Sequence, residues 1–295
     1  MQLRKRTEDR AWLPPLLHLL AFVGVYLLAV WTPWGQRAEN ALFAGAAATG
    51  GASAWVWDAS GHYGAPVAVP PLGTSALPTL LAGLALLAAV AVVRRRWWPG
   101  AVAVTSVLLA FGATEILAKH VLPRPDLVHA PFALVAPSFP SGHVGIPAAL
   151  VLGAVLVAPA RARRVVAAVG TVWVAFTAAA VLATYQHRPS DALGATLLAC
   201  AGFLVAATLS ARRAPATEPR GSRSLGVSTP VLAVAAALVG GARSDSLLES
   251  LVFAATGLMC AALVWFAAER ATGPGGLSSG RVRVMPAEPA RAAAR

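Results

Sequence analysis

The sequence has little charge: Asp, Glu, Lys and Arg make up only 12% of its 295 residues, whereas 57% are hydrophobic. A soluble domain carries about twice that charged fraction. Cysteine is scarce as well, and both cysteines, Cys200 and Cys260, fall inside long apolar runs. We therefore expect them to be packing residues and not a disulfide. The composition as a whole argues against a soluble globular protein.

Apolar runs fill the chain instead, and most of them are long enough to cross a bilayer as an α-helix. The pattern predicts an all-α, polytopic membrane helix bundle with about eight transmembrane helices. The expected spans are residues 12–31, 74–93, 101–117, 144–160, 165–183, 192–209, 225–240 and 247–266.

The few charges are unevenly distributed, with 24 basic residues, 12 acidic residues and a net charge of +12. If successive spans alternate in direction, most basic residues lie on the same side as both termini, and the positive-inside rule makes that side cytoplasmic. The charge therefore reports orientation in a membrane and argues against a nucleic-acid partner. The excess of arginine over lysine and the abundance of alanine suggest a bacterial source, so we expect the cell (cytoplasmic) membrane. The basic residues on the outer side are Arg37, Lys119, Arg124, Arg188 and Arg243.

Polar or small-residue segments divide the chain. Residues 36–73 are expected to form a long outer loop, partly helical, with Trp55, Trp57 and Tyr63 at the lipid–water interface. No small-residue cleavage site follows the first run, so we expect it to be a retained helix. The predicted organisation is a six-helix core (1–210), a cytoplasmic linker (211–224), a two-helix C-terminal appendage (225–268) and a disordered basic tail (269–295).

Polar residues gather on the predicted outer side between the third span and the start of the sixth. Ionisable groups at a membrane boundary cost free energy, so a cluster of them indicates a functional site, although each residue alone would pass for an ordinary loop residue. The cluster comprises His120, His129, His143, His187, Lys119, Arg124, Asp126, Ser141 and Asp191.

The stretch FPSGHVGIP precedes the fourth span. Ser141 suits the N-cap, Gly142 lets a ligand approach the backbone, and the free N–H groups of a helix start attract an anion. His143 in that first turn is able to donate a proton or a hydrogen bond. The alternative is an ordinary capped helix with an interfacial histidine.

Two further stretches complete the cluster. In QHRPSDALG, Asp191 is one turn from His187 and is able to fix its tautomer, which makes the other ring nitrogen a better nucleophile; a capping aspartate is the alternative. In EILAKHVLPRPDL, Lys119 and Arg124 suit a phosphate, Glu115 is spaced for an ion pair with Lys119, and snorkelling to the headgroups is the alternative.

In this order, the three stretches resemble the type 2 phosphatidic acid phosphatase superfamily of membrane lipid phosphatases. The chain has the family's Pro-Ser-Gly-His at residues 140–143 and its His-x3-Asp at His187 and Asp191. It departs from the family in two places. Lys119 and Arg124 are separated by four residues where the family has six, and the arginine of the family's Ser-Arg pair is replaced by Val181. Arg188 is our candidate replacement.

The resemblance implies metal-independent hydrolysis of a lipid phosphate at the outer membrane face, with no cofactor. His187 would form a phosphohistidine, Asp191 would orient it, and His143 would protonate the leaving group. Expected substrates are a polyprenyl pyrophosphate or a glycerolipid phosphate held in the bilayer. The expected phosphate-binding residues are Lys119, Arg124, Ser141, Gly142 and Arg188.

Two other functions stay open at this point. One is a phosphotransferase that passes the phosphoryl group from His187 to a hydroxyl compound. The other is a catalytically inactive relative that binds or transports an anionic lipid, which the missing arginine and altered spacing would also suit, although the presence of His143, His187 and Asp191 weighs against it. An ordinary channel or transporter is disfavoured, because the predicted spans hold few ionisable residues apart from His18 and Glu115.

Overall fold

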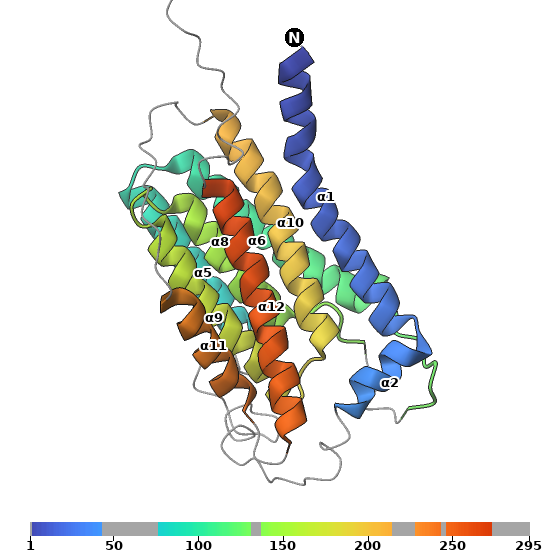
Figure 1. The fold of residues 1–295 in the computed structure, drawn as a ribbon. Helices are drawn as coiled ribbons and strands as arrows, with labels where there is room; N and C mark the ends of the chain where they lie inside the picture. Colours follow the sequence, from blue (N-terminus) through green and yellow to red (C-terminus); the bar gives the residue numbers. More distant parts are fainter. Residues whose placement is uncertain (1, 43–75, 131–136, 214–227, 243–245, 273–295) are drawn as a thin grey trace, which may run out of the picture.

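The computed structural model describes residues 2–42, 76–130, 137–213, 228–242 and 246–272, and all regular elements within these ranges are helices (Figure 1). They are α1 (Gln2–Val30), α2 (Pro33–Ala41), α5 (Leu77–Val93), α6 (Trp97–Ile116), the π-helical turn η1 (Leu117–Val121), α8 (Gly142–Val157), α9 (Arg163–Ala183), α10 (Pro189–Arg213), α11 (Ser228–Gly241) and α12 (Leu247–Thr272).

Each of the eight predicted spans is a helix, which confirms the polytopic helix bundle. Helices α1, α6, α9, α10 and α12 are long and apolar enough to cross a membrane, and α5, α8 and α11 are shorter apolar helices. Large apolar side chains such as Leu28, Leu109 and Val169 are exposed on the outside of the bundle. That surface suits contact with lipid and not with water.

The segment after α1 begins with helix α2, which agrees with the expected partly helical character of this region. Pro33 occupies the first turn, and Thr32 caps the helix by accepting the N–H of Gly35. The expected interfacial residues Trp55, Trp57 and Tyr63 lie outside the described residues, as do most of the linker and of the basic tail.

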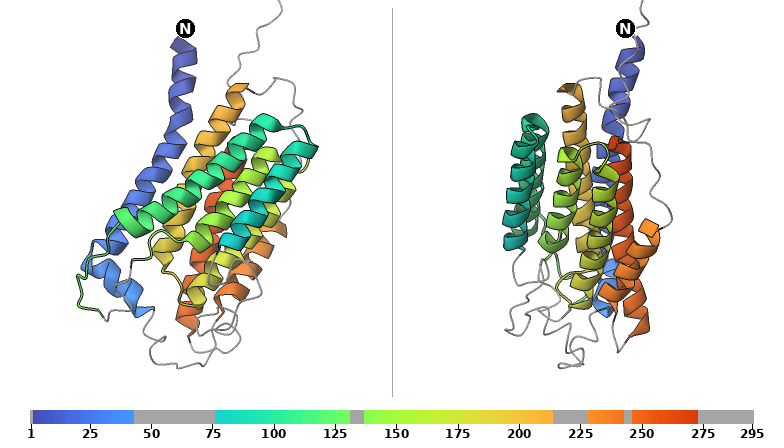
Figure 2. Two further views of the ribbon diagram at one scale, coloured as in Figure 1. Left: turned by 180° about the vertical axis from the view of Figure 1, so that it is seen from behind. Right: turned by 90° about the vertical axis from the view of Figure 1, so that its left-hand side faces the viewer.

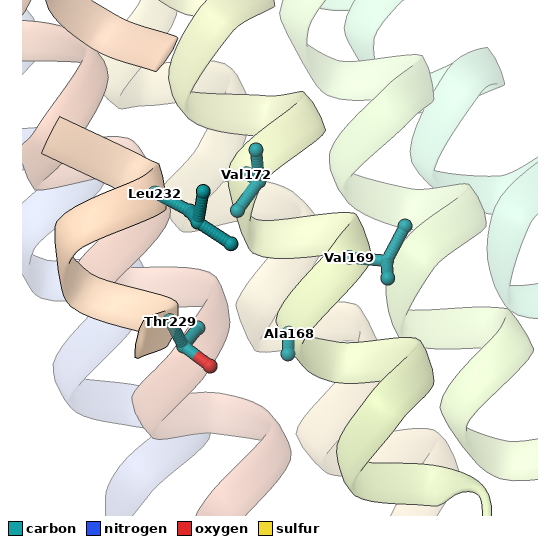
Figure 3. Close-up of a pocket in the computed structure, with 5 residues that line it drawn as sticks. All are labelled: Ala168, Val169, Val172, Thr229 and Leu232. Carbon is teal, nitrogen blue, oxygen red and sulfur yellow. The ribbon is translucent and has the colours of Figure 1, made fainter. Parts of the chain in front are cut away.

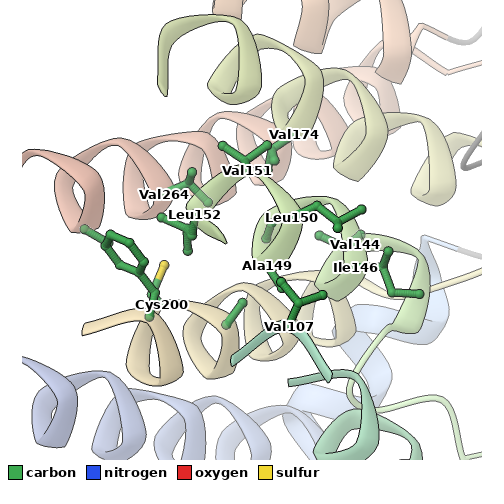
Figure 4. Packing of buried hydrophobic residues seen from close by; sticks show 14 of the residues in the cluster. Val107, Val144, Ile146, Ala149, Leu150, Val151, Leu152, Val174, Cys200 and Val264 are labelled. Carbon is green, nitrogen blue, oxygen red and sulfur yellow. The ribbon is translucent and has the colours of Figure 1, made fainter. Parts of the chain in front are cut away.

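Helices α5 and α6 lie on one flank of the bundle, α8 and α9 in the middle, and α11 and α12 on the other flank (Figure 2). Helix α8 is buried along nearly its whole length. Figure 4 shows its side chains packed against Val107 of α6, Val174 of α9 and Cys200 of α10. Cys200 and Cys260 are both buried and free, as predicted for packing residues.

The C-terminal pair α11–α12 packs closely on α9 (Figure 1). Small residues make this possible, as is usual where membrane helices approach each other. A Cβ added at Gly257 of α12 would lie 2.5 Å from the carbonyl oxygen of Ala175, and one added at Gly240 of α11 would lie 2.6 Å from that of Phe176. Cys260 and Val264 of α12 also join the main apolar core.

Helix α12 also contacts the turn that follows α9. The hydroxyl of Tyr185 donates to Oε2 of Glu249 over 3.0 Å, and its ring packs edge-on against Phe253. Tyr185 has a φ of 56°, a left-handed conformation that costs free energy in a non-glycine residue. Contacts from α12 therefore help to hold the turn that leads to His187.

A small apolar pocket lies between α9 and α11 (Figure 3). It is found in the half of α9 that is remote from His187, and its lining offers a single hydroxyl, that of Thr229. Its composition suits a hydrocarbon group and not a charged ligand. The lining residues are Ala168, Val169, Val172, Thr229 and Leu232.

We expect Gly257→Ala to destabilise the protein by about 1–3 kcal/mol, because its methyl group would meet backbone atoms of α9. The control is Gly202→Ala in α10, where a Cβ would have nothing within 4 Å, so this variant is expected to be neutral or slightly stabilising. Thermal unfolding in detergent measures both. Equal melting temperatures would contradict the close packing of α12 on α9.

Candidate active site

The first turns of α8 and α10 lie side by side at one end of the bundle. The backbone N–H of Ser141 donates to the carbonyl oxygen of Asp191 over 3.0 Å. The Ser141 side chain caps α8 by accepting the N–H of Val144, and Pro189 begins α10, both as predicted. This backbone bond joins the two stretches that carry the candidate catalytic histidines.

His143 and His187 are direct neighbours, although 44 positions separate them in the sequence. Nδ1 of His143 and Nε2 of His187 are 3.1 Å apart, and the ring centroids are 5.3 Å apart. One nitrogen of this pair must carry a proton for the contact to be a hydrogen bond. A proton on either nitrogen would therefore be shared between the two imidazoles at this end of the bundle.

Asp191 lies behind His187 and is fully buried. Its Oδ2 accepts the hydroxyl of Ser138 at 2.6 Å and the backbone N–H of Arg188 at 2.9 Å, and it lies 3.6 Å from Nδ1 of His187. That last distance exceeds a hydrogen bond, and such contacts often tighten only when substrate binds. The carboxylate thus faces one ring nitrogen of His187 and leaves the other for His143.

Arg188 is buried beside this carboxylate. Its Nη1 donates to the Ser138 hydroxyl over 2.9 Å, so one hydroxyl links the guanidinium to Asp191. Burial lowers the pKa of Arg188, and the charge of nearby Arg124 lowers it further. The charges of Asp191 and Glu39 oppose this shift. Val181, which stands where the family has arginine, is also buried. Arg188 therefore places a guanidinium next to the histidine–aspartate pair, although it occupies a different position in the chain from Val181.

Arg124 lies in the same network through an acidic residue of α2. Its Nη1 is 3.4 Å from Oε2 of Glu39, and both side chains are almost fully buried. Its Nη2 is buried and has no hydrogen-bond partner within the ranges described. Burial raises the pKa of Glu39, with a further contribution from Asp191, whereas its hydrogen bonds from Ser190 and the charge of Arg124 oppose the rise.

Lys119 lies apart from this network on the turn η1, with about two thirds of its side chain exposed. It forms the predicted ion pair with Glu115. Oε1 of Glu115 would be 3.5 Å from a Cβ at Gly142, so the ion pair lies next to the start of α8. Among the described residues, the Glu115 carboxylate is the group that connects Lys119 to the start of α8.

The other polar residues of the predicted cluster are peripheral. His120 and His129 are exposed. Asp126 is exposed as well, and its Oδ1 accepts the N–H groups of Val128 and Ala130 in a local turn.

Sequence reasoning missed three residues that the structure adds to the site. Glu39 and Gln36 lie in the predicted outer loop, and Gln36 reaches the site because its Nε2 donates to the carbonyl of Pro125, next to Arg124, over 2.6 Å. Ser138 lies just before the Pro-Ser-Gly-His stretch. A signal for Glu39 existed, because carboxylates are rare in this chain and residues 36–73 hold few of them. Within the described ranges, no group of three or more His, Cys, Asp or Glu has the geometry to hold a metal ion.

The arrangement suits transfer of an anionic group. A carboxylate-backed imidazole supplies a nucleophile, a second imidazole in contact with it supplies an acid or base, and arginines supply positive charge. A phosphoryl group would have to enter between the two rings and replace their direct hydrogen bond.

Comparison with known proteins supports this chemistry. No curated protein and no solved structure matches the chain. Residues 97–215, which run from the start of α6 to just beyond α10, match the sequence profile of the PAP2 superfamily. The match contains His143, His187 and Asp191 and ends before α11. The match confirms, over residues 97–215, the resemblance to this superfamily that the sequence motifs predicted.

Proposed function

We propose that the protein hydrolyses a lipid phosphate monoester or pyrophosphate through a phosphohistidine at His187. The match of residues 97–215 to the PAP2 superfamily and the membrane-spanning helices support a phosphatase-type function in a membrane. The observation that carries the finer proposal is the 3.1 Å contact between His143 and Nε2 of His187, with Asp191 on the opposite side of the His187 ring.

In the first step, Nε2 of His187 attacks phosphorus while the bond to the leaving oxygen breaks. His143 gives a proton to that oxygen, and Asp191 stabilises the positive charge that develops on the His187 ring. In the second step, a water molecule passes a proton to His143 and attacks phosphorus. The P–N bond then breaks and inorganic phosphate leaves.

Positive charge and backbone N–H groups hold the phosphoryl oxygens in both steps, because phosphoryl transfer depends mainly on positioning and charge stabilisation. Nη2 of Arg124, which is buried and has no hydrogen-bond partner among the described residues, supports a role for Arg124 in this. Arg188, Gly142, Ser141 and Lys119 are the further proposed ligands, with Arg188 in the role of the arginine absent at Val181.

The substrate class follows from the setting of the site. The histidines lie at the end of an apolar bundle, so a phosphate on a prenyl or acyl chain reaches them with its tail in the bilayer. The distribution of basic residues in the sequence favours the outer face of the cytoplasmic membrane for this end, with both termini inside.

The first test is phosphate release by the purified protein from dioctanoyl phosphatidic acid and farnesyl pyrophosphate. We expect His187→Ala to abolish release and His143→Ala to reduce it by about 10²–10⁴-fold. His120→Ala, an exposed histidine at the same end, is the matched control and keeps full activity. Activity is expected to persist with EDTA.

An active His187→Ala variant would overturn the proposed nucleophile. Transfer of phosphate to added alcohols in preference to water would identify a phosphotransferase instead. Lipid binding without turnover on either substrate would indicate an inactive binding protein.

We expect Arg188→Ala to lower kcat/KM by about a hundredfold, because a charged donor to the phosphoryl group would be lost. Arg188→Lys keeps the charge but not the fork of donors and is expected to recover only part of the activity. Steady-state kinetics on both substrates measure this. Full activity of Arg188→Ala would show that another group replaces the missing arginine.

A further inference from the structure

Residues outside the superfamily match hold the loop that carries Arg124. The loop follows η1, and α1 and α2 bind it at alternate positions on both sides of Arg124. The hydroxyl of Tyr26 donates to the carbonyl of Pro123 over 2.7 Å, Nε2 of Gln36 donates to that of Pro125 over 2.6 Å, and the N–H of Leu127 donates to Oε1 of Gln36 over 3.2 Å.

Glu39 of α2 adds a contact to the Arg124 side chain itself. Its Oε2 lies 3.4 Å from Nη1 of Arg124, while its Oε1 accepts the backbone N–H of Ser190 over 3.0 Å. Ser190 is in the first turn of α10, directly before Asp191. One buried carboxylate therefore bridges the Arg124 loop and the helix that orients the nucleophile.

This contact determines where Arg124 points. A guanidinium is planar, so fixing Nη1 also restricts the direction of Nη2. Nη2 is buried and lacks a partner in the described part of the chain. A buried charged donor of this kind is expected to be satisfied by an anion.

The local charges make the contact necessary. Arg124 and Arg188 lie close enough to repel each other. Asp191 and Glu39 both attract the guanidinium of Arg188, and Glu39 also attracts that of Arg124. Without the Glu39 charge, Arg124 would lose its ion-pair partner and still face a second buried arginine. It would then have more than one orientation.

We propose that Glu39 is a positioning residue, which fixes the guanidinium of Arg124 relative to helix α10 and so prepares it for a phosphoryl group. The inference rests on the proposed phosphatase function. Glu39 acts through Arg124 and Ser190, and it supplies no group to the substrate.

Glu39→Gln separates this role from simple charge attraction. The amide keeps the shape of the side chain and an acceptor for Ser190, but it loses the negative charge. Loss of orientation weakens transition-state stabilisation, whereas removal of a negative charge favours binding of an anionic substrate. We therefore expect kcat to fall about tenfold while KM stays within about twofold.

A double-mutant cycle tests whether Glu39 acts through Arg124. Wild type, Glu39→Gln, Arg124→Ala and the double variant are assayed on dioctanoyl phosphatidic acid and on farnesyl pyrophosphate. Arg124→Ala is expected to lower kcat about a hundredfold. If Glu39 acts through Arg124, adding Glu39→Gln to Arg124→Ala changes kcat by less than about twofold. Glu269→Gln in the last turn of α12, at the other end of the bundle, is the matched control and keeps wild-type kinetics.

Two results would overturn the inference while the proposed function stands. In the first, the wild type is active and the two substitutions multiply, so that the double variant is about a thousandfold slower. If each substitution lowered kcat only by reducing the amount of folded protein, the two effects would also multiply, and this result would overturn the inference as well. In the second, Glu39→Gln has wild-type kcat. A wild type inactive on both substrates would instead overturn the proposed function, and with it this inference.

Discussion

A backbone hydrogen bond between Ser141 and Asp191 is the contact on which the site depends. It brings the beginnings of α8 and α10 together, and each beginning carries part of the chemistry. His143 is two residues after Ser141, and His187 is one turn before Asp191, so the two rings meet at 3.1 Å. Because α8 is buried between neighbouring helices, its start cannot shift along the bundle without disturbing the apolar core. The precision of the histidine pair is thus supplied by helix packing.

The polar network around the pair is compact and buried, with two arginines balanced by two carboxylates. Ser138 connects Arg188 to Asp191 as both acceptor and donor, and Glu39 connects Arg124 to Ser190. Buried charges are costly unless they are paired and hydrogen-bonded. Here the pairs share members, which limits the number of arrangements that satisfy all of them. A site prepared in this way would need little reorganisation to receive an anionic group.

The helices were predictable from the sequence because a bilayer demands long apolar runs. Counting the alternating spans also predicted that His143, His187 and Asp191 lie at the same end of the bundle. The caps at Ser141 and Pro189 follow from local chemistry and were predictable for that reason. The contact between Glu39 and Ser190 joins residues 151 positions apart, and no local pattern encodes such a contact. Helix α2 is short, and the sequence predicted only a partly helical loop in this region without locating the helix. The role of Ser138 depends on the path of the chain between η1 and α8, which periodicity does not reveal.

Tyr185 connects α12 of the terminal helix pair to the turn that precedes His187. Its strained backbone lies two residues before His187, and its side chain is held by Glu249 and Phe253 at the start of α12. Helix α12 faces lipid along part of its surface, so its tilt responds to the thickness of the surrounding bilayer. Through these contacts, a change in the tilt of α12 would reach the turn that carries His187.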